Sequence, residues 1–115
     1  MGRLTTHILD TANGCPAAGV NIRLFAIDGE RRQVAATVSN ADGRTDEPLA
    51  DGDAMATGRY ELEFDIGDYF RDRGVDLAEP AFLDTVVIRF SIDAGEDYHV
   101  PLLASPWSYS TYRGS

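Results

Sequence analysis

The chain contains two histidines, His7 and His99, which lie near its opposite ends. Histidine titrates near neutral pH, so either imidazole can take a proton from a water molecule that attacks a carbonyl carbon. Near the C-terminus, Tyr112 supplies a hydroxyl that can donate or relay a proton, and Arg113 supplies a permanent cation with a planar fork. These residue types favour hydrolysis of an oxygen-rich substrate, with a cation stabilising the oxyanion that develops.

Other chemistries fit the sequence less well. Two histidines hold a catalytic zinc only with a third protein ligand; a carboxylate or Cys15 could supply one, but no HExxH spacing occurs. No Gly-x-Ser-x-Gly elbow marks a nucleophilic serine, and Cys15, beside Pro16 in a turn, is more typical of a small filler. The loop around Asp42 does not match a calcium-binding loop, because Val38 stands at the first ligand position. We therefore expect neither a metal nor a cofactor.

The C-terminal stretch predicts two strands joined by a corner at Ser105-Pro106, because it is rich in β-branched and aromatic residues around one turn signal. Side chains alternate between the faces of a strand. Alternation groups these residues by face: His99, Pro101 and Leu103 on the first strand, and Ser110, Tyr112 and Gly114 on the second. A histidine, a tyrosine hydroxyl and Arg113 can then meet on or beside one sheet. A half-buried hairpin with a surface histidine explains the same pattern without chemistry.

The rest of the chain predicts short strands separated by turns about every ten residues. The expected strands are 4–10, 20–28, 33–39, 59–66 and 84–93. In the fourth, Tyr60, Leu62, Phe64 and Ile66 alternate with charged residues and so form an inward face. A short helix is expected over 68–73, with Asp68 as N-cap and Gly74 as C-cap. This pattern predicts an all-β fold, an antiparallel β-sandwich with one short helix.

Length and charge limit the possible functions. The chain has 115 residues, which predicts one domain over 1–115. Its net charge is −9, with ten arginines and no lysine, so neither nucleic acid nor an anionic membrane is expected as a partner. One cysteine excludes an internal disulfide, and no apolar run of about 20 residues or signal peptide is visible. A cytoplasmic location is therefore expected.

Three stretches resemble the transthyretin-like 5-hydroxyisourate hydrolases. The C-terminal HVPLL and SPWSYSTYRGS are similar to the end of that family, whose YRGS terminus is its signature. Near the N-terminus, THILDT and GCPA (residues 6–11 and 14–17) resemble the family's Thr-His pair and its Gly-x-Pro-Ala. GRTDEPL, from Gly43, resembles the family's Gly-Arg-Thr loop. The resemblance runs from one end of the chain to the other.

The resemblance implies a fold of the transthyretin type and a homotetramer with its site at the dimer–dimer interface. It implies hydrolysis of 5-hydroxyisourate to 2-oxo-4-hydroxy-4-carboxy-5-ureidoimidazoline, a step of urate degradation. The site residues that it implies are His7, Arg44 and His99 as catalytic, and Tyr112, Arg113, Gly114 and Ser115 as substrate-binding. At Asp97 the chain departs from the family, which commonly has a second histidine there. The charge of Asp97 can shift the pKa of His99.

Two other classes of function remain open on the fold alone. A carrier of the transthyretin type binds a small aromatic ligand in a central channel without catalysis. His7, Arg44, His99 and the YRGS ending argue against a carrier, because carriers of that type lack them. A generic sandwich module for adhesion or carbohydrate binding is usually exported, and no export signal is seen.

Overall fold

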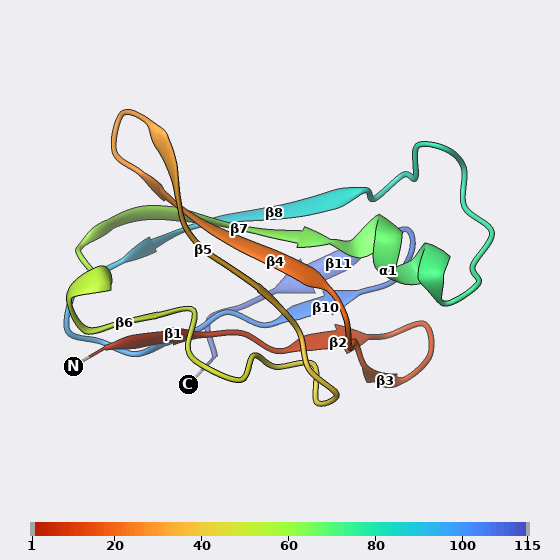
Figure 1. Cartoon of the computed structure of the whole chain (residues 1–115), viewed down its shortest axis with the longest axis horizontal. Helices are drawn as coiled ribbons and strands as arrows, with labels where there is room; N and C mark the ends of the chain where they lie inside the picture. Colours follow the sequence, from red (N-terminus) through yellow and green to blue (C-terminus); the bar gives the residue numbers. More distant parts are fainter. Residues whose placement is uncertain (1, 115) are drawn as a thin grey trace.

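The computed structural model describes residues 2–114 of the chain. Two layers of β-strands face each other, and one short helix lies at one end of the upper layer (Figure 1). The elements, in chain order, are β1 (Arg3–Thr5), β2 (Ile8–Asp10), β3 (Cys15–Pro16), β4 (Asn21–Ile27), β5 (Arg31–Val38), β6 (Ala50–Asp51), the 3-10 helix η1 (Gly52–Ala54), β7 (Gly58–Asp65), α1 (Ile66–Asp72), β8 (Thr85–Ile92), β9 (Tyr98–His99), β10 (Leu102–Ala104) and β11 (Tyr109–Thr111).

The upper layer is one antiparallel sheet in the order β5-β4-β7-β8. Its strands have seven or eight residues, and the alternation predicted from the sequence decides which side chains face inward. Leu24 lies opposite Leu62, and Phe64 lies opposite Val86, so apolar residues form continuous rows on the inner face. The predicted inward face of the 59–66 segment is confirmed, because its four apolar side chains are buried.

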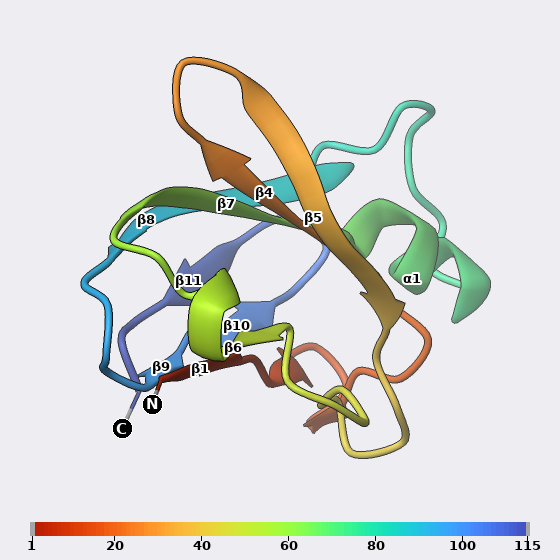
Figure 2. The ribbon, with the colours of Figure 1, turned by 60° about the vertical axis from the view of Figure 1, so that its left-hand side comes forward.

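The lower layer consists of two short sheets, in the orders β6-β1-β9 and β11-β10-β2-β3. The pairs β1–β9 and β2–β10 are parallel, so this layer is mixed. The other strand pairs are antiparallel, and the predicted all-β sandwich with one short helix is confirmed. Figure 2 shows β9 beside β1, the strand at the start of the described chain. The parallel pairs place residues near the start of the chain next to residues near its end.

The predicted first strand, 4–10, is two strands separated at Thr6 and His7. The two halves have different neighbours, because β1 pairs with β6 and β9 whereas β2 pairs with β3 and β10. At the break, the Ile8 amide donates to the carbonyl of Gly43 at 2.7 Å. Gly43 has φ +77°, and a Cβ there would lie 2.4 Å from the carbonyl oxygen of Ile8, so this close approach requires glycine.

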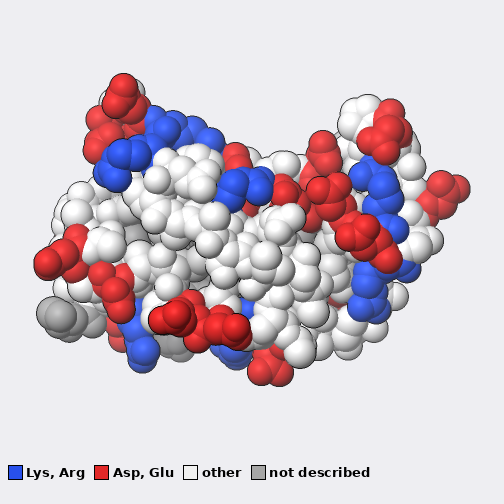
Figure 3. Space-filling model, in the orientation of Figure 1, with Lys and Arg blue, Asp and Glu red and all other residues white. Residues whose placement is uncertain are grey.

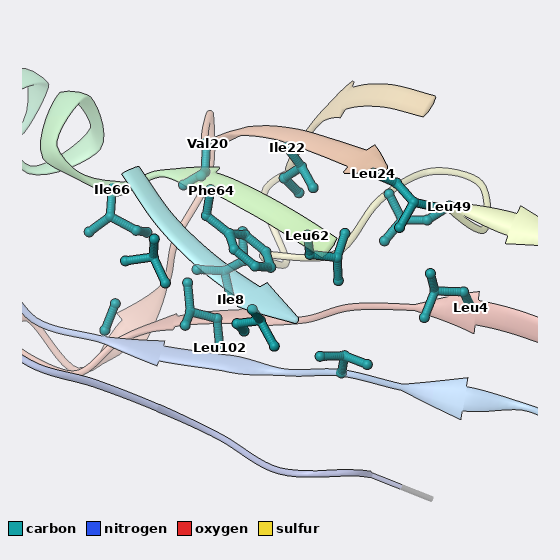
Figure 4. Close-up of a cluster of buried hydrophobic side chains, with 14 of the residues drawn as sticks. Leu4, Ile8, Val20, Ile22, Leu24, Leu49, Leu62, Phe64, Ile66 and Leu102 are labelled. Atoms are coloured by element: carbon teal, nitrogen blue, oxygen red, sulfur yellow. The ribbon is translucent and has the colours of Figure 1, made fainter. Parts of the chain in front are cut away.

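The core fills the space between the layers (Figure 4). Leu4, Ile8 and Leu102 point upward from the lower layer toward Leu62 and Phe64 of the upper layer, and all five side chains are fully buried. Burying side chains of this size stabilises the fold by about 1.5–3 kcal/mol each. The core therefore fixes which face of each lower strand points inward, and so which residues the opposite face presents.

Helix α1 begins two residues earlier than the sequence predicted, at Ile66 instead of Asp68. Asp65 occupies the N-cap position, but its side chain makes no capping hydrogen bond because it binds Arg23. The first turn packs tightly instead, since the amide of Gly67 donates to the carbonyl of Asp84 at 2.9 Å. Packing of this buried turn against the segment before β8, rather than a polar cap, sets the start of the helix.

Charged side chains of both signs lie side by side over the tip of the β4–β5 hairpin and around α1 (Figure 3). The net charge of −9 is therefore not collected into one acidic patch on this face. Within residues 2–114, no helix is long and apolar enough to cross a membrane.

Candidate active site

His7 and His99 lie on the same outward face of the lower layer. Thr5 pairs with His99 across the parallel β1–β9 pair, and the amide of Leu102 donates to the carbonyl of His7 at 2.9 Å. Because Leu4, Thr6 and Ile8 are buried on the inner face, the residues between them point outward and are half-buried. The sequence predicted this alternation, and the parallel pairing adds the second histidine to the same face.

The C-terminal segment continues this face. Leu103 pairs with Ser110, and His99 forms an isolated antiparallel bridge with Gly114, whose amide donates to the His99 carbonyl at 2.7 Å. In this register Tyr112 lies across from Pro101. The predicted grouping of these residues by face therefore agrees with the register. Tyr112 is 61% exposed, so its hydroxyl is open to a ligand.

Gly114 lies directly against the imidazole of His99. A Cβ on Gly114 would lie 2.6 Å from Cδ2 of that ring, closer than carbon atoms approach. The backbone of the C-terminal segment thus covers one side of the histidine. Ser115, which the resemblance places in the site, lies outside the described residues.

Thr5 is a contact of His99 that the sequence reasoning missed. Its Oγ1 lies 2.9 Å from Nδ1 of His99, a hydrogen bond whose direction depends on the imidazole tautomer. Alternation places Thr5 on the side of His7, but no local signal in the sequence shows that β1 lies beside β9. A hydrogen bond at one ring nitrogen orients the imidazole and leaves the other nitrogen for chemistry.

The pKa of His99 is lowered from its ordinary value of 6.5. Burial is the main cause, and electrostatic interactions with Arg44 and His7 add to it. His99 is therefore neutral at neutral pH, the state in which an imidazole accepts a proton. The contributions of Arg44 and His7 also place these two residues within electrostatic reach of His99.

Arg44 comes from a turn that packs against the break between β1 and β2. Asn40 organises this turn, because its side-chain oxygen accepts hydrogen bonds from the amides of Asp42 at 2.9 Å and of Arg44 at 3.2 Å. The side chain of Arg44 is exposed. The structure thus brings the three predicted catalytic residues, His7, Arg44 and His99, to one region.

Two adjoining hollows open on this region. One, of about 240 Å³, is lined by Arg3, Thr5 and Arg44 among others. The other, of about 180 Å³, is lined by Arg3, Thr5, Asp97, Tyr98 and His99. Each is smaller than the 300–1,000 Å³ or so that is usual for a small-molecule site.

Arg113 is not brought to the histidines. Its guanidinium carbon lies 4.2 Å from the centre of the Tyr98 ring, and its Nη2 lies 3.1 Å from Oε1 of Glu96. Tyr98 precedes His99 in β9 and faces the core, so Arg113 lies on the face opposite His99. The alternation that groups Tyr112 with Gly114 also separates Arg113 from them, and this signal was present in the sequence.

Within residues 2–114, no three His, Cys, Asp or Glu side chains come together closely enough to hold a metal ion. The region around His7 and His99 can instead supply a neutral imidazole, a second imidazole and a guanidinium. These groups suit proton transfer and stabilisation of an anion.

The sequence matches known proteins along its whole length. The model of the HIUase/Transthyretin family matches residues 4–114. The 5-hydroxyisourate hydrolase of Ralstonia nicotianae is 59% identical over 117 residues, covering 100% of both chains. The 5-hydroxyisourate hydrolase of Pseudomonas aeruginosa is 56% identical over 117 residues, covering 100% of this chain and 93% of the relative.

Solved structures share the fold. An (S)-allantoin synthase superposes with a TM-score of 0.93 at 45% identity, covering 99% of this chain but 44% of that longer chain. The Klebsiella pneumoniae 5-hydroxyisourate hydrolase has a TM-score of 0.83 at 34% identity, covering 100% of both chains. Sea bream transthyretin in complex with thyroxine has a TM-score of 0.87 at 28% identity, covering 97% of this chain and 94% of that one. The chain belongs to the HIUase/Transthyretin family and has its β-sandwich fold.

Proposed function

We propose that this chain is a hydrolase that opens the ring of 5-hydroxyisourate in urate degradation. The product is 2-oxo-4-hydroxy-4-carboxy-5-ureidoimidazoline. The observation that carries the proposal is the meeting of His7, Arg44 and His99 on one face, in a chain 56–59% identical to proteins named 5-hydroxyisourate hydrolase. Transthyretin has the same fold, so the side chains rather than the sandwich carry this choice.

His99 acts as the general base in this proposal. If Nδ1–H donates to Oγ1 of Thr5, Nε2 is left unprotonated and can accept a proton from water. The lowered pKa keeps His99 neutral at pH 7, so the base is ready without a prior deprotonation. Water then adds to a ring carbonyl carbon as its proton moves to His99.

Arg44 and His7 act on the charge that this addition creates. The carbonyl oxygen becomes an oxyanion, and the permanent cation of Arg44 can stabilise it. When the oxyanion collapses, the ring C–N bond breaks and the carbonyl becomes a carboxylic acid. The departing nitrogen takes the proton that His99 accepted from water, directly or relayed through His7. One water is consumed, and no electron transfer is needed.

We propose that the site is completed by neighbouring subunits in a homotetramer in the cytoplasm. The two hollows beside His99 measure about 180 and 240 Å³ in the single chain, which is little for a bicyclic substrate. Packing a second copy over the outward face would enclose the histidines and exclude water. Light scattering at micromolar concentration should give four times the mass of the chain, and a monomer would contradict this proposal.

Fresh 5-hydroxyisourate, made from urate with urate oxidase, provides the test. Its near-ultraviolet absorbance decays spontaneously, and this chain should accelerate the decay in proportion to its concentration. Dialysis against a strong chelator should leave the rate unchanged, because no step uses a metal. Absence of acceleration would end the hydrolase proposal and favour a carrier.

A further inference from the structure

We propose that Arg113 is a positioning residue for His99: it holds the C-terminal segment so that the backbone of Gly114 lies against the imidazole. In this role Arg113 acts through the chain and does not contact the substrate. The inference rests on the proposed function and replaces the substrate-binding role expected for Arg113. It follows from three contacts of the guanidinium and from the register of the strand.

The guanidinium of Arg113 is held on three sides. It stacks on Tyr98 at 4.2 Å, and its Nη2 donates to Oε1 of Glu96 at 3.1 Å and to the carbonyl of Asp97 at 3.3 Å. The Tyr98 ring is held in place, since it is only 8% exposed and its hydroxyl accepts a hydrogen bond from the amide of Asp93 at 2.7 Å. These contacts fix the backbone one residue before Gly114.

The register turns this attachment into a constraint on His99. Successive side chains of an extended chain point to opposite faces, so fixing Arg113 on the Tyr98 face directs Gly114 to the His99 face. The Gly114 amide then donates to the His99 carbonyl at 2.7 Å, and the glycine backbone meets the ring. A side chain at position 114 would push against Cδ2 of the imidazole.

The hollow beside Arg113 is separate from the hollow beside His99. It measures about 240 Å³ and is lined by residues 88–91 of β8, which include Arg89, by Tyr98 and Val100, and by the segment 111–113. His99 is absent from that lining, because it points to the other face of the layer. A substrate held by the guanidinium in this hollow would lie on the wrong side of the sheet for the base.

The covering by Gly114 has a measurable consequence at His99. Burial is the main cause of the lowered pKa of His99, so lifting the C-terminal segment should raise that pKa toward 6.5. The charged or titratable groups around the ring are His7 and Arg44, which lower the pKa, and Arg3 and Asp97, which line the same hollow. Neutralising Glu96 changes none of these four groups.

The experiment compares Glu96→Ala, Arg113→Gln and the double variant with a matched control, Asp28→Ala. Asp28 also pairs with an arginine, Arg32, at 3.7 Å and is exposed, but it lies on the other layer. For each full-length protein, kcat and KM for fresh 5-hydroxyisourate are measured, and the imidazole of His99 is titrated by NMR without substrate. Thermal unfolding checks that every variant is folded.

We expect Glu96→Ala to lower kcat by about two- to fivefold, the scale of an exposed ion pair, with KM nearly unchanged. Arg113→Gln also loses the stacking contact and should lower kcat by about tenfold. Both should raise the pKa of His99. The double variant should match Arg113→Gln alone, since both changes break the same attachment of the Arg113 guanidinium. Asp28→Ala should behave as wild type.

A different pattern would overturn the proposal. If Arg113→Gln raises KM while Glu96→Ala matches Asp28→Ala, the guanidinium contacts substrate. Gly114→Ala gives a second route, and an unshifted His99 pKa in that variant would also contradict the role of the backbone cover. If the wild type does not accelerate ring opening, the proposed function fails, but the NMR titrations still decide whether Arg113 and Gly114 position His99.

Discussion

The outer faces of the two layers differ in how their charges are partnered. On the upper layer, Arg23 pairs with Glu63 at 2.8 Å and with Asp65 at 2.6 Å. Arg31 of β5 reaches across β4 to pair with Glu61 and Glu63 of β7. On the lower layer, His7 and His99 lie close to a cation, Arg44, and the ion pairs formed within residues 2–114 do not include it. On the outer face of the upper layer, arginines are paired with carboxylates. On the outer face of the lower layer, the cation beside the histidines is left available to a ligand.

The strands differ in the same way. The upper strands run for seven or eight residues, whereas those of the lower layer have two or three and break where their partners change. Long ladders satisfy backbone groups and resist change. The breaks let a turn carrying Arg44 and the end of the chain approach the histidines. Function in this fold is therefore expected where the sheet is interrupted, and stability where it is regular.

The largest effect should come from the two histidines of the lower layer. His7→Asn and His99→Asn should each reduce kcat by on the order of a hundredfold or more, the usual scale of general acid–base catalysis. Both variants should remain folded, because both side chains are only half-buried. Steady-state kinetics with fresh substrate measures the loss, and a variant with full activity would make its histidine structural.

A smaller loss is expected from the C-terminal segment. Deleting residues 113–115 removes the Gly114 backbone that lies against His99 and the Arg113 contacts that hold it there, so kcat should fall at least about tenfold. The melting temperature should change little, since this segment buries little apolar surface. Kinetics and calorimetry on the same preparation separate the two effects. Wild-type kinetics from the deletion would show that the segment is not part of the site.

The sequence predicted which face of a strand each residue occupies better than it predicted which strands lie side by side. Alternation gave the inward row of the 59–66 segment and the outward row that holds His7, because burial of apolar side chains at period two is a local property. The break at Thr6 and His7 was missed, since it depends on two different pairing partners from distant parts of the chain. The contact between Thr5 and His99 was missed for the same reason.

For Arg113, the role implied by the family resemblance differs from the position implied by the alternation of side chains. A signature that ends in YRGS suggested that all its residues contact one substrate. Alternation separates Arg113 from Tyr112 and Gly114, and the contacts with Tyr98 and Glu96 agree with that separation. The start of α1 is a simpler case: the sequence offered Asp68 as a cap, and packing of the preceding turn decided otherwise.

An intermediate effect is expected at Arg44. Arg44→Gln should lower kcat/KM by about tenfold through loss of a cation at the oxyanion. It should also raise the pKa of His99, because the positive charge that disfavours protonation is gone. As the pH is lowered, the variant should therefore lose activity at a higher pH than the wild type does. Arg59→Gln, on β7 of the upper layer, is the control; equal pH profiles for the two variants would contradict the coupling.

The smallest effect on activity is expected on the upper layer. Arg23→Gln should lower the free energy of unfolding by about 1 kcal/mol at neutral pH and leave kcat within about twofold of wild type. The hydrogen bond from Arg23 lowers the pKa of Asp65, so this stabilisation is present at neutral pH and is lost as the pH falls below about 4. Denaturant titrations should show a larger difference between variant and wild type at pH 7 than at pH 3. A large loss of kcat would contradict the division between the two faces.

The most direct test of the account compares two acid dissociation constants. One is the pKa of His99, followed by NMR in the free protein, and the other is the acid limb of the pH profile of kcat/KM, which reports the base of the free enzyme. The account predicts that both lie below 6.5 and coincide, and that the acid limb disappears in His99→Asn. An NMR pKa at or above 6.5, or an acid limb that persists in His99→Asn, would contradict the assignment of His99 as the base.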